Sequence, residues 1–310
     1  MTRHLLTIFD LSTKEIESLL IRARELKAIQ KQGIECRPLK GKTLGLLFEK
    51  QSTRTRLSFE VAALQLGGHS IYLSPHQIQM GRGEELRDTA RVFSRYLDGV
   101  VIRTFEHKMI EEFAGNSSIP VINGLTDIHH PCQIISDMLT ILEKKDRISG
   151  IRLAYIGDGN NVAHSLIEGA AVMGMNIRIA SPKGYEPDNR ITEIARQKAK
   201  ETGAVIEIME DPFEAVDNAD VVYTDVWTSM GQEEEEGKRK SVFKKYRINR
   251  ELMKKAKGDA IILHCLPAHR GEEITDEMME SPQSVVFDQA ENRLHMQKAL
   301  LEMLMGNRKQ

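Results

Sequence analysis

Residues 43–68 read TLGLLFEKQSTRTRLSFEVAALQLGG. The apolar run Thr43–Phe48 is typical of a buried strand, and the spacing of apolar residues then predicts a helix over Thr53–Leu66. Ser52 stands between the two as a good N-cap, and a glycine pair ends the helix. A strand that leads through a short turn into a helix predicts an α/β fold with parallel strands.

The same alternation continues along the chain. Further strands are expected at His69–Leu73, Gly99–Arg103, Ile119–Ile122, Arg152–Ile156, Asn176–Ala180, Val205–Ile208, Val221–Thr224, Ala260–His264 and Val285–Phe287. Helices are expected near Glu85–Arg95, Glu106–Ala114, Gln133–Lys145 and about Gln289–Met305, with others in the remaining gaps. This order predicts two doubly wound α/β domains, each a central parallel sheet flanked by helices, with the C-terminal helix packing back on the first domain.

The domain boundary is expected in the polar segment Lys144–Gly150, which ends in glycine. A chain of 310 residues suits two domains, and this boundary divides it into 1–148 and 149–310. Two other segments are irregular in sequence: His76–Gly83, which is polar and contains glycine, and Ser229–Lys240, which contains four consecutive glutamates and ends in Lys-Arg-Lys. A charge run of this kind is typical of a solvated loop.

The composition excludes several classes of protein. The net charge of −2 provides no basic field for nucleic acid or for an anionic membrane surface. No stretch approaches the roughly 18 apolar residues of a membrane-spanning helix, and the N-terminus lacks the apolar core of a signal peptide. The three cysteines, Cys36, Cys132 and Cys265, are far apart, so we expect no disulfide framework, no structural zinc site and a cytoplasmic location.

The turn before the helix at Thr53 is a candidate anion site. Ser52 to Thr55 form the first helical turn, where unpaired backbone N–H groups and the positive end of the helix dipole converge. Arg54 can add a bidentate contact to a phosphate group. On local physics alone the other interpretation, a well-capped helix with two surface arginines, stays open.

Three more segments carry polar groups at the ends of predicted elements. Arg103 ends a strand, where α/β sheets bind ligands, although a surface arginine is an equal alternative. His129 and His130 precede a helix start, and without an acidic partner at ligand spacing they make a poor metal site. Cys265 follows a buried strand, where a thiol is more often inert.

Taken together, the strings resemble the signatures of the aspartate and ornithine carbamoyltransferases. Ser-Thr-Arg-Thr-Arg at 52–56, His-Pro-Cys-Gln at 130–133 and His-Cys-Leu-Pro at 264–267 match in order and at compatible spacing over essentially the whole chain. The resemblance implies that the Leu266–Pro267 bond is cis. It also implies that carbamoyl phosphate is bound by Ser52, Thr53, Arg54, Thr55, Gln79, Arg103, His130, Pro131, Cys132, Gln133, Cys265, Leu266 and Arg293. Among these it implies catalytic roles for Arg54, Arg103, His130 and Cys265.

Two loops in the second half concern the acceptor. Gly-Asp-Gly-Asn-Asn at 157–161 is similar to a dinucleotide fingerprint, but Val162 replaces the third glycine and no acidic residue ends the next strand, so a nicotinamide cofactor is not expected. Asp225–Gly231 resembles the Asp-x-x-x-Ser-Met-Gly loop of the ornithine-type enzymes, whereas by itself it is an ordinary strand-end loop. The resemblance implies ornithine binding by Asn161, Asp225, Ser229 and Met230.

The implied activity is transfer of the carbamoyl group from carbamoyl phosphate to the δ-amino group of L-ornithine, which gives L-citrulline and phosphate in arginine biosynthesis. The resemblance further implies a homotrimer that needs neither a cofactor nor a metal. Three alternatives remain: another amine acceptor such as putrescine, a catabolic role in arginine breakdown, and a non-catalytic binding module or dinucleotide enzyme on a similar scaffold.

Overall fold

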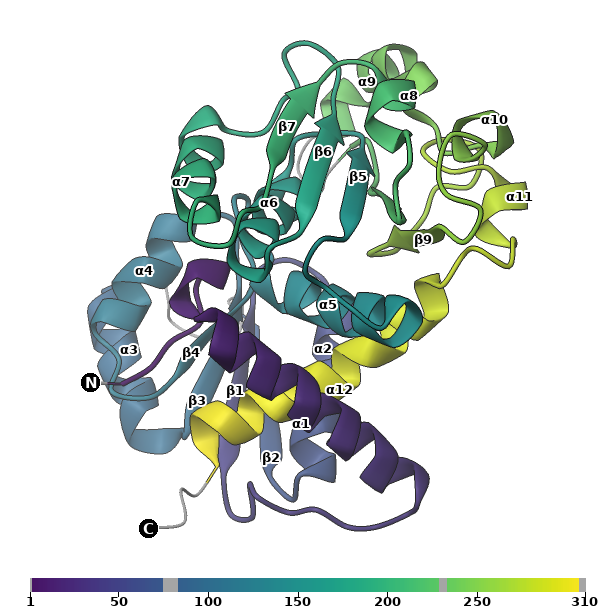
Figure 1. Ribbon diagram of the computed structural model, residues 1–310. Helices are drawn as coiled ribbons and strands as arrows, with labels where there is room; N and C mark the ends of the chain where they lie inside the picture. The colour runs from purple at the N-terminus through teal and green to yellow at the C-terminus, as the bar shows by residue number, and fades with distance from the viewer. Residues whose placement is uncertain (1, 75–82, 229–232, 307–310) are drawn as a thin grey trace. The chain divides into compact units, whose positions relative to one another are not determined.

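The chain forms two compact units, Met1–Leu139 with Asn292–Gln310, and Thr140–Glu291. The computed structural model describes residues 2–74, 83–228 and 233–306 (Figure 1). The chain passes between the units inside two helices, α5 (Pro131–Lys145) and α12 (Val286–Met305). Most of the C-terminal helix therefore belongs to the first unit, as predicted.

The first unit is built on a parallel sheet with the strand order β2-β1-β3-β4. Its strands are β1 (Thr43–Phe48), β2 (His69–Leu73), β3 (Gly99–Arg103) and β4 (Val121–Leu125). They are connected by α2 (Thr53–Gln65), α3 (Leu86–Tyr96) and α4 (His107–Gly115). Because β2 lies on one side of β1 and β3 on the other, the strand order reverses between β1 and β3, the position at which such sheets bind ligands.

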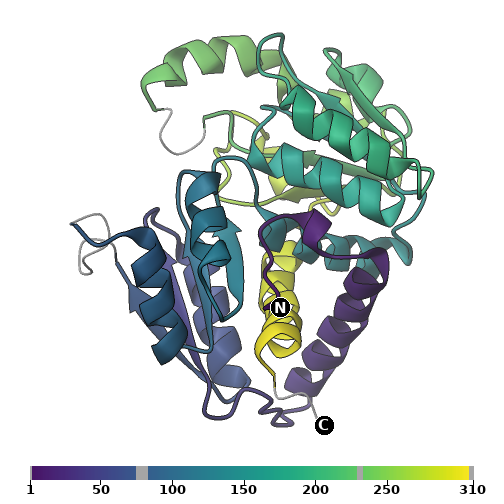
Figure 2. The same cartoon turned by 90° about the vertical axis from the view of Figure 1, so that its left-hand side faces the viewer.

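Helices cover both faces of this sheet. The helices α3 and α4 lie side by side on one face, and α1 (Thr13–Lys31) lies with α12 on the other (Figure 2). Two polar contacts join α1 to α12: Arg22 Nε lies 2.8 Å from Glu302 Oε2, and Lys27 Nζ donates to Asn292 Oδ1 over 2.7 Å. Helix α1 is not among the helices predicted by residue range from the sequence, although Ser12 and Glu15 form a capping box at its start.

The second unit repeats the same principle. Its parallel sheet has the order β7-β6-β5-β8-β9, so the reversal lies between β5 and β8. The strands are β5 (Arg152–Ile156), β6 (Asn176–Ala180), β7 (Ile206–Met209), β8 (Val221–Thr224) and β9 (Ile261–His264). The helices α6 (Asn161–Met173) and α7 (Asn189–Ala199) lie side by side along one face (Figure 2).

Shorter elements complete the described chain. They are η1 (Ile8–Asp10), α8 (Pro212–Val216), η2 (Glu233–Glu235), α9 (Glu236–Phe243), η3 (Lys244–Tyr246), α10 (Arg250–Met253) and α11 (Asp276–Met279).

Each unit has its own apolar core. In the first unit Ile102, Ile110 and Phe113 are fully buried together, and in the second Trp227 packs with Phe243. Each unit is thus a parallel sheet flanked by helices, which confirms the predicted α/β fold class.

One predicted strand is wrong. Val285–Phe287 was expected to be a strand, but α12 begins at Val286. Only Ser284 forms an isolated bridge, with Ile262, and the Val285 amide donates to the Ile262 carbonyl over 3.1 Å. A short apolar run fits a buried strand and a buried helix start equally well, so periodicity alone could not separate them.

A helix that crosses a membrane must be both long and apolar. Within 2–74, 83–228 and 233–306 no helix combines the length and the apolar character that crossing a bilayer requires.

Candidate functional site

The first unit gathers its polar groups at the reversal between β1 and β3. The turn after β1 leads into α2, and Arg103 ends β3 in register with Phe48 of β1. The N-cap Ser52 has extended backbone geometry, and its Oγ accepts a hydrogen bond from the Thr55 amide over 3.2 Å. The predicted strand–turn–helix is therefore confirmed, with the first-turn amides of α2 at the carboxyl edge of the sheet.

Thr55 is the centre of this cluster. Its side chain is 1% exposed, and its hydroxyl accepts from Arg293 Nη2 over 2.7 Å and from Arg103 Nη1 over 3.5 Å. Both arginines are themselves buried. Residues from α2, β3 and α12 thus meet at one hydroxyl, and they place two guanidinium groups beside the start of α2.

His130 lies in the same cationic environment. Burial is the largest cause that places its pKa well below the ordinary value, and the charges of Arg293, Arg103 and Arg54 lower it further. The imidazole is therefore neutral at neutral pH. A neutral imidazole can donate a hydrogen bond from one ring nitrogen without adding a positive charge.

Gln133 offers an acceptor in the first turn of α5. Its Nε2 donates to Asp137 Oδ1 over 2.8 Å, which fixes the orientation of the amide. Its Oε1 is buried and finds no hydrogen-bond partner among the described residues. A buried oxygen of this kind costs free energy of about 1–3 kcal/mol until an N–H donor reaches it. This atom is therefore placed to accept from a ligand amide.

Three other residues of the strings at 52–56 and 130–133 have local structural contacts or positions. Pro131 is the first residue of α5, where a missing N–H costs nothing. Burial raises the pKa of the Cys132 thiol to about 12, and its Sγ donates to the Asn123 carbonyl over 3.3 Å. Arg56 is held by Glu60, 2.8 Å away, and its guanidinium lies over the Tyr72 ring. Cys132 is thus an un-ionised thiol.

The second unit gathers its polar groups between β5 and β8. Residues 157–161 form the turn from β5 into α6, and Asn160 is the N-cap, accepting from the amides of Val162 and Ala163 over 3.0 and 3.2 Å. Gly159 has no space for a side chain, because a Cβ there would lie 2.2 Å from the Pro187 backbone nitrogen. The turn is therefore tightly constrained.

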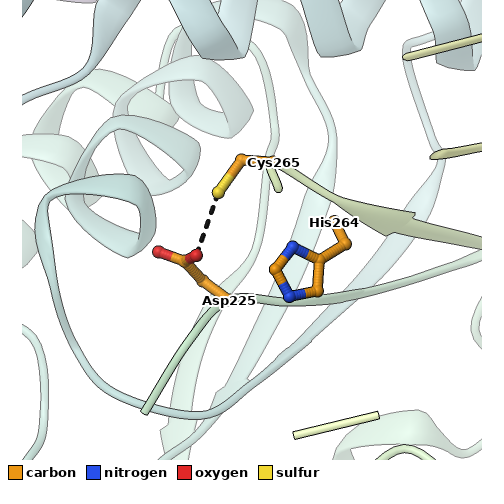
Figure 3. Close-up of side chains that lie close together, drawn as sticks. All are labelled: Asp225, His264 and Cys265. Carbon is orange, nitrogen blue, oxygen red and sulfur yellow. Dashed lines mark hydrogen bonds between the residues drawn. The ribbon is translucent and has the colours of Figure 1, made fainter. Parts of the chain in front are cut away.

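Asp225 connects three of the strand-end segments. Its Oδ1 accepts from Cys265 Sγ over 2.9 Å, which Figure 3 shows, and from the Val226 amide over 2.8 Å. Its Oδ2 accepts from Asn160 Nδ2 over 2.8 Å. The carboxylate is buried, so these hydrogen bonds hold its two oxygens in a defined orientation.

His264 accepts a hydrogen bond from the backbone of Leu266, the residue that follows Cys265. Its Nδ1 accepts from the Leu266 amide over 2.9 Å, so Nε2 carries the proton that it shares with Glu273 Oε1 at 2.9 Å. The Leu266–Pro267 bond is cis, as predicted, and Leu266 has a positive φ of 59°. Asp225, His264 and Cys265 lie close enough for a metal, but both ring nitrogens of His264 are already engaged.

Some predicted residues lie apart from these clusters or outside the described residues. Gln79, Ser229 and Met230 fall in the segments that the structure does not describe. Thr53 is exposed at the first position of α2. Asn161 begins α6 directly after the Asn160 cap.

Four residues that organise the second cluster are not among the site residues predicted from the sequence: Asn160, Glu273, Asp158 and Arg239. Asn160 and Asp158 stand in the string at 157–161, and Asn160 is also a cap-forming residue before a helix. Glu273 and Arg239 are recognised by their tertiary contacts with His264 and Asp158.

A cavity of about 490 Å³ lies elsewhere in the first unit. It is lined by the ends of α1 and α2, by residues 33–37, and by Lys298 of α12. None of the predicted site residues lines it, so the cavity and the polar clusters are separate features.

Comparisons with known proteins match both units. The model described as the carbamoyl-P binding domain of aspartate/ornithine carbamoyltransferase matches residues 3–143. The model described as the Asp/Orn binding domain of the same group matches residues 149–304.

Three relatives show the extent of the similarity. An ornithine carbamoyltransferase from Syntrophus aciditrophicus is 54% identical over 304 residues, which cover 98% of this chain and 100% of the relative. An ornithine carbamoyltransferase from Pyrococcus furiosus that is named anabolic is 51% identical, covering 98% and 96%. A solved structure of ornithine carbamoyltransferase from Pyrococcus furiosus matches with a TM-score of 0.96 at 51% identity and covers 99% of this chain and 98% of that chain.

The tight turn at Gly159 gives a test of the second cluster. Gly159→Ala should lower the free energy of unfolding by about 1–3 kcal/mol, because the added Cβ would collide with backbone atoms of residues 186 and 187. Gly237→Ala is the matched control, since nothing lies within 4 Å of its Cβ and alanine favours a helix. Urea unfolding at one protein concentration measures both, and equal stability of the two variants would contradict the described turn.

Proposed function

We propose that this chain, which belongs to the aspartate/ornithine carbamoyltransferase family, transfers the carbamoyl group of carbamoyl phosphate to the δ-amino group of L-ornithine. The products are L-citrulline and inorganic phosphate. Full-length relatives at 51–54% identity that are named ornithine carbamoyltransferase support this activity. The observation that carries it in the structure is the cationic cluster around Thr55 and His130.

The cluster in the first unit suits the phosphate and the carbonyl of carbamoyl phosphate. The amides at Ser52–Thr55 and the side chains of Arg54, Arg103 and Arg293 supply hydrogen bonds and positive charge for the phosphate. Thr55, Arg103 and His130 then face the oxyanion that forms on the carbonyl during attack. Donors that are already oriented stabilise such a charge without reorganisation.

The carbamoyl NH₂ group is assigned to Gln133. The buried Oε1 of this residue lacks a partner among the described atoms, and the hydrogen bond to Asp137 turns it into a fixed acceptor. The matching signature also assigns the Leu266 carbonyl to the same NH₂ group, and assigns Pro131 and Cys132 to the wall of the substrate site. An acceptor for N–H distinguishes a carbamoyl phosphate from an acyl phosphate that lacks the amide.

The second unit is assigned to ornithine. Asp225 accepts the α-amino group, and Asn161 binds the α-carboxylate. Support comes from the orientation of the Asp225 carboxylate by Asn160 and Cys265, and from the matching Gly-Asp-Gly-Asn-Asn turn. Ser229 and Met230 complete this half by the resemblance alone.

The chemical step is acyl transfer without a cofactor. The neutral δ-amine attacks the carbonyl carbon, a tetrahedral oxyanion forms, and the C–O bond to phosphate breaks. The leaving phosphate dianion takes the proton that the amine loses. Cys265 is assigned a position beside the attacking amine and forms no covalent intermediate. Orientation of two substrates and charge stabilisation supply the catalysis.

The proposal also covers the direction of the reaction in the cell, the location of the protein and its oligomeric state. The biosynthetic direction, towards citrulline and arginine, is supported by the relative that is named anabolic. The three free cysteines agree with a cytoplasmic enzyme. A homotrimer in which Gln79 reaches the site of a neighbouring subunit rests on the resemblance.

A panel of amines tests the activity. Incubation with carbamoyl phosphate and ornithine, putrescine, N-acetylornithine or aspartate should give ureido product from L-ornithine with a kcat/KM at least about 100-fold above any other amine. A colorimetric assay for ureido groups, with mass spectrometry of the product, measures this. Dominant carbamoylputrescine would assign the enzyme to a different amine, and no product from any amine would remove the proposal.

Arg54 tests the phosphate assignment. Arg54→Ala should lower kcat/KM for carbamoyl phosphate by about 100-fold, because it removes charge-assisted hydrogen bonds from the phosphate. Arg91→Ala is the control, since Arg91 is exposed and pairs with Asp88 on the surface of α3. Steady-state kinetics at saturating ornithine measure both variants. Wild-type kcat/KM in Arg54→Ala would disprove the assignment of phosphate to this turn.

The pH dependence follows from two nitrogen bases, the His130 imidazole and the δ-amine of ornithine. Because the pKa of His130 is well below its ordinary value, the imidazole stays neutral as pH rises from 6. The δ-amine of ornithine resembles lysine, with an ordinary pKa of about 10.4, so its reactive form increases about tenfold for each pH unit. The logarithm of kcat/KM for ornithine should therefore rise with unit slope from pH 6 to 8. A plateau that begins near pH 6.5 would show that an imidazole controls the rate instead.

A further inference from the structure

Arg239 is buried although it lies in a run of charged residues. The residue is only 5% exposed, whereas the charge run predicted a solvated loop. Its Nη1 lies 3.0 Å from Asp158 Oδ2 and donates to the Trp227 carbonyl over 2.9 Å. Its Nε donates to Glu235 Oε2 over 3.0 Å. One guanidinium group thus connects α9 with two other segments of the second unit.

The two segments are the ones that carry the predicted ornithine contacts. Asp158 lies in the turn after β5, three residues before Asn161. Trp227 lies in the loop after β8, two residues after Asp225. A second link between them is direct, because Asn160 Nδ2 donates to Asp225 Oδ2 over 2.8 Å. Arg239 is therefore a further bridge between the segments that follow β5 and β8.

The contacts of Arg239 with Asp158 and Trp227 form a tether between the two segments, and aromatic packing holds this tether in place. The guanidinium lies 4.9 Å from the centroid of the Tyr185 ring, and Trp227 stacks on Phe243 at 6.0 Å with 25° between the planes. Phe243 also packs edge-on against Tyr185. Arginine suits this position because a planar fork can reach acceptors in different directions while its face rests on a ring. A lysine ammonium has neither the planar face nor the fixed fork.

We propose that Arg239 is a positioning residue for the amine acceptor: by binding the Asp158 carboxylate and the Trp227 carbonyl together, it sets the spacing between Asn161 and Asp225. The inference rests on the proposed function, because it treats these two residues as the ornithine contacts. Arg239 itself acts through Asp158 and Trp227. Its loss should therefore weaken ornithine binding while leaving the carbamoyl-phosphate cluster of the first unit unchanged.

The pKa of Asp158 shows that Arg239 helps to keep this buried carboxyl group ionised. Burial raises the pKa of Asp158 to about 6, and the charges of Asp225 and Glu235 raise it as well, whereas Arg239 lowers it. Without the guanidinium the carboxyl group would take up a proton at higher pH. In the wild-type protein the ion pair requires an ionised Asp158, so it should weaken as pH falls towards 6.

Kinetics of Arg239→Gln and Arg239→Lys test the proposal. Both variants should raise the KM for L-ornithine about tenfold or more. The KM for carbamoyl phosphate and kcat should change less than about threefold, because the first unit is unaltered and the chemical groups remain. Lys240→Gln is the matched control on the next residue of α9, where an exposed ammonium pairs with Glu236 and Glu272. It should keep wild-type constants.

The pH profile distinguishes positioning from a general loss of stability. The increase in the ornithine KM of Arg239→Gln relative to wild type should be largest at pH 8 and should shrink as pH falls to 6, because wild-type Asp158, whose pKa is about 6, then loses the charge that pairs with Arg239. Asp158→Asn should show the same narrowing relative to wild type, since it lacks that charge at every pH. Asp158→Asn alone also serves if Arg239→Gln fails to fold, and it should raise the ornithine KM in the same direction.

The outcomes separate this inference from the proposed activity. Wild-type ornithine KM in Arg239→Gln or in Asp158→Asn, or equal increases in the KM of both substrates, would overturn the positioning role. If the wild-type enzyme makes no citrulline, the proposed function fails, and amide hydrogen exchange then tests the tether alone. Faster exchange at residues 157–163 and 225–228 in Arg239→Gln than in Lys240→Gln would support it, and equal exchange would overturn it.

Discussion

Parallel strands place all their carboxyl ends on one edge of a sheet, and both units are built on this constraint. In each sheet the strand order reverses once, between β1 and β3 and between β5 and β8. Polar residues that follow those strands are therefore brought together, although they are far apart in sequence. Thr55 and Arg103 meet in this way in the first unit, and Asn160 and Asp225 in the second. The positions of the clusters follow from strand order more than from any single motif.

The first cluster is arranged before an anion arrives. Burying guanidinium groups costs free energy, and the cost is offset when a negative charge binds among them. Arg103 and Arg293 converge on Thr55, and the same charges, after burial, keep His130 neutral. The cluster therefore holds positive charge on arginine, which does not lose its proton, and leaves the imidazole as an uncharged donor. This division suits a substrate with both a phosphate and a carbonyl oxygen.

The second cluster uses a different balance. Its buried carboxylates are compensated inside the protein: Asp158 by Arg239, and Asp225 by hydrogen bonds from Asn160 and Cys265. Such internal partners fix orientation more than they add net stability. The strand-end loops are thereby oriented relative to one another before a ligand is present. An acceptor amino acid needs this geometry, because its amino and carboxylate groups are separated by a fixed distance.

The sequence by itself determined the strand–turn–helix units and the literal strings at 52–56, 130–133 and 264–267, because capping and apolar periodicity are local properties. Local signals failed at 285–287, where a short apolar run also fits a helix, and α1 was not singled out despite its capping box. Only the tertiary structure decided which distant side chains meet. Arg293 reaches Thr55 across 238 residues, and Arg239 is buried within a charged run. The physical reason is that burial and partner choice depend on how the chain packs, which no short segment encodes.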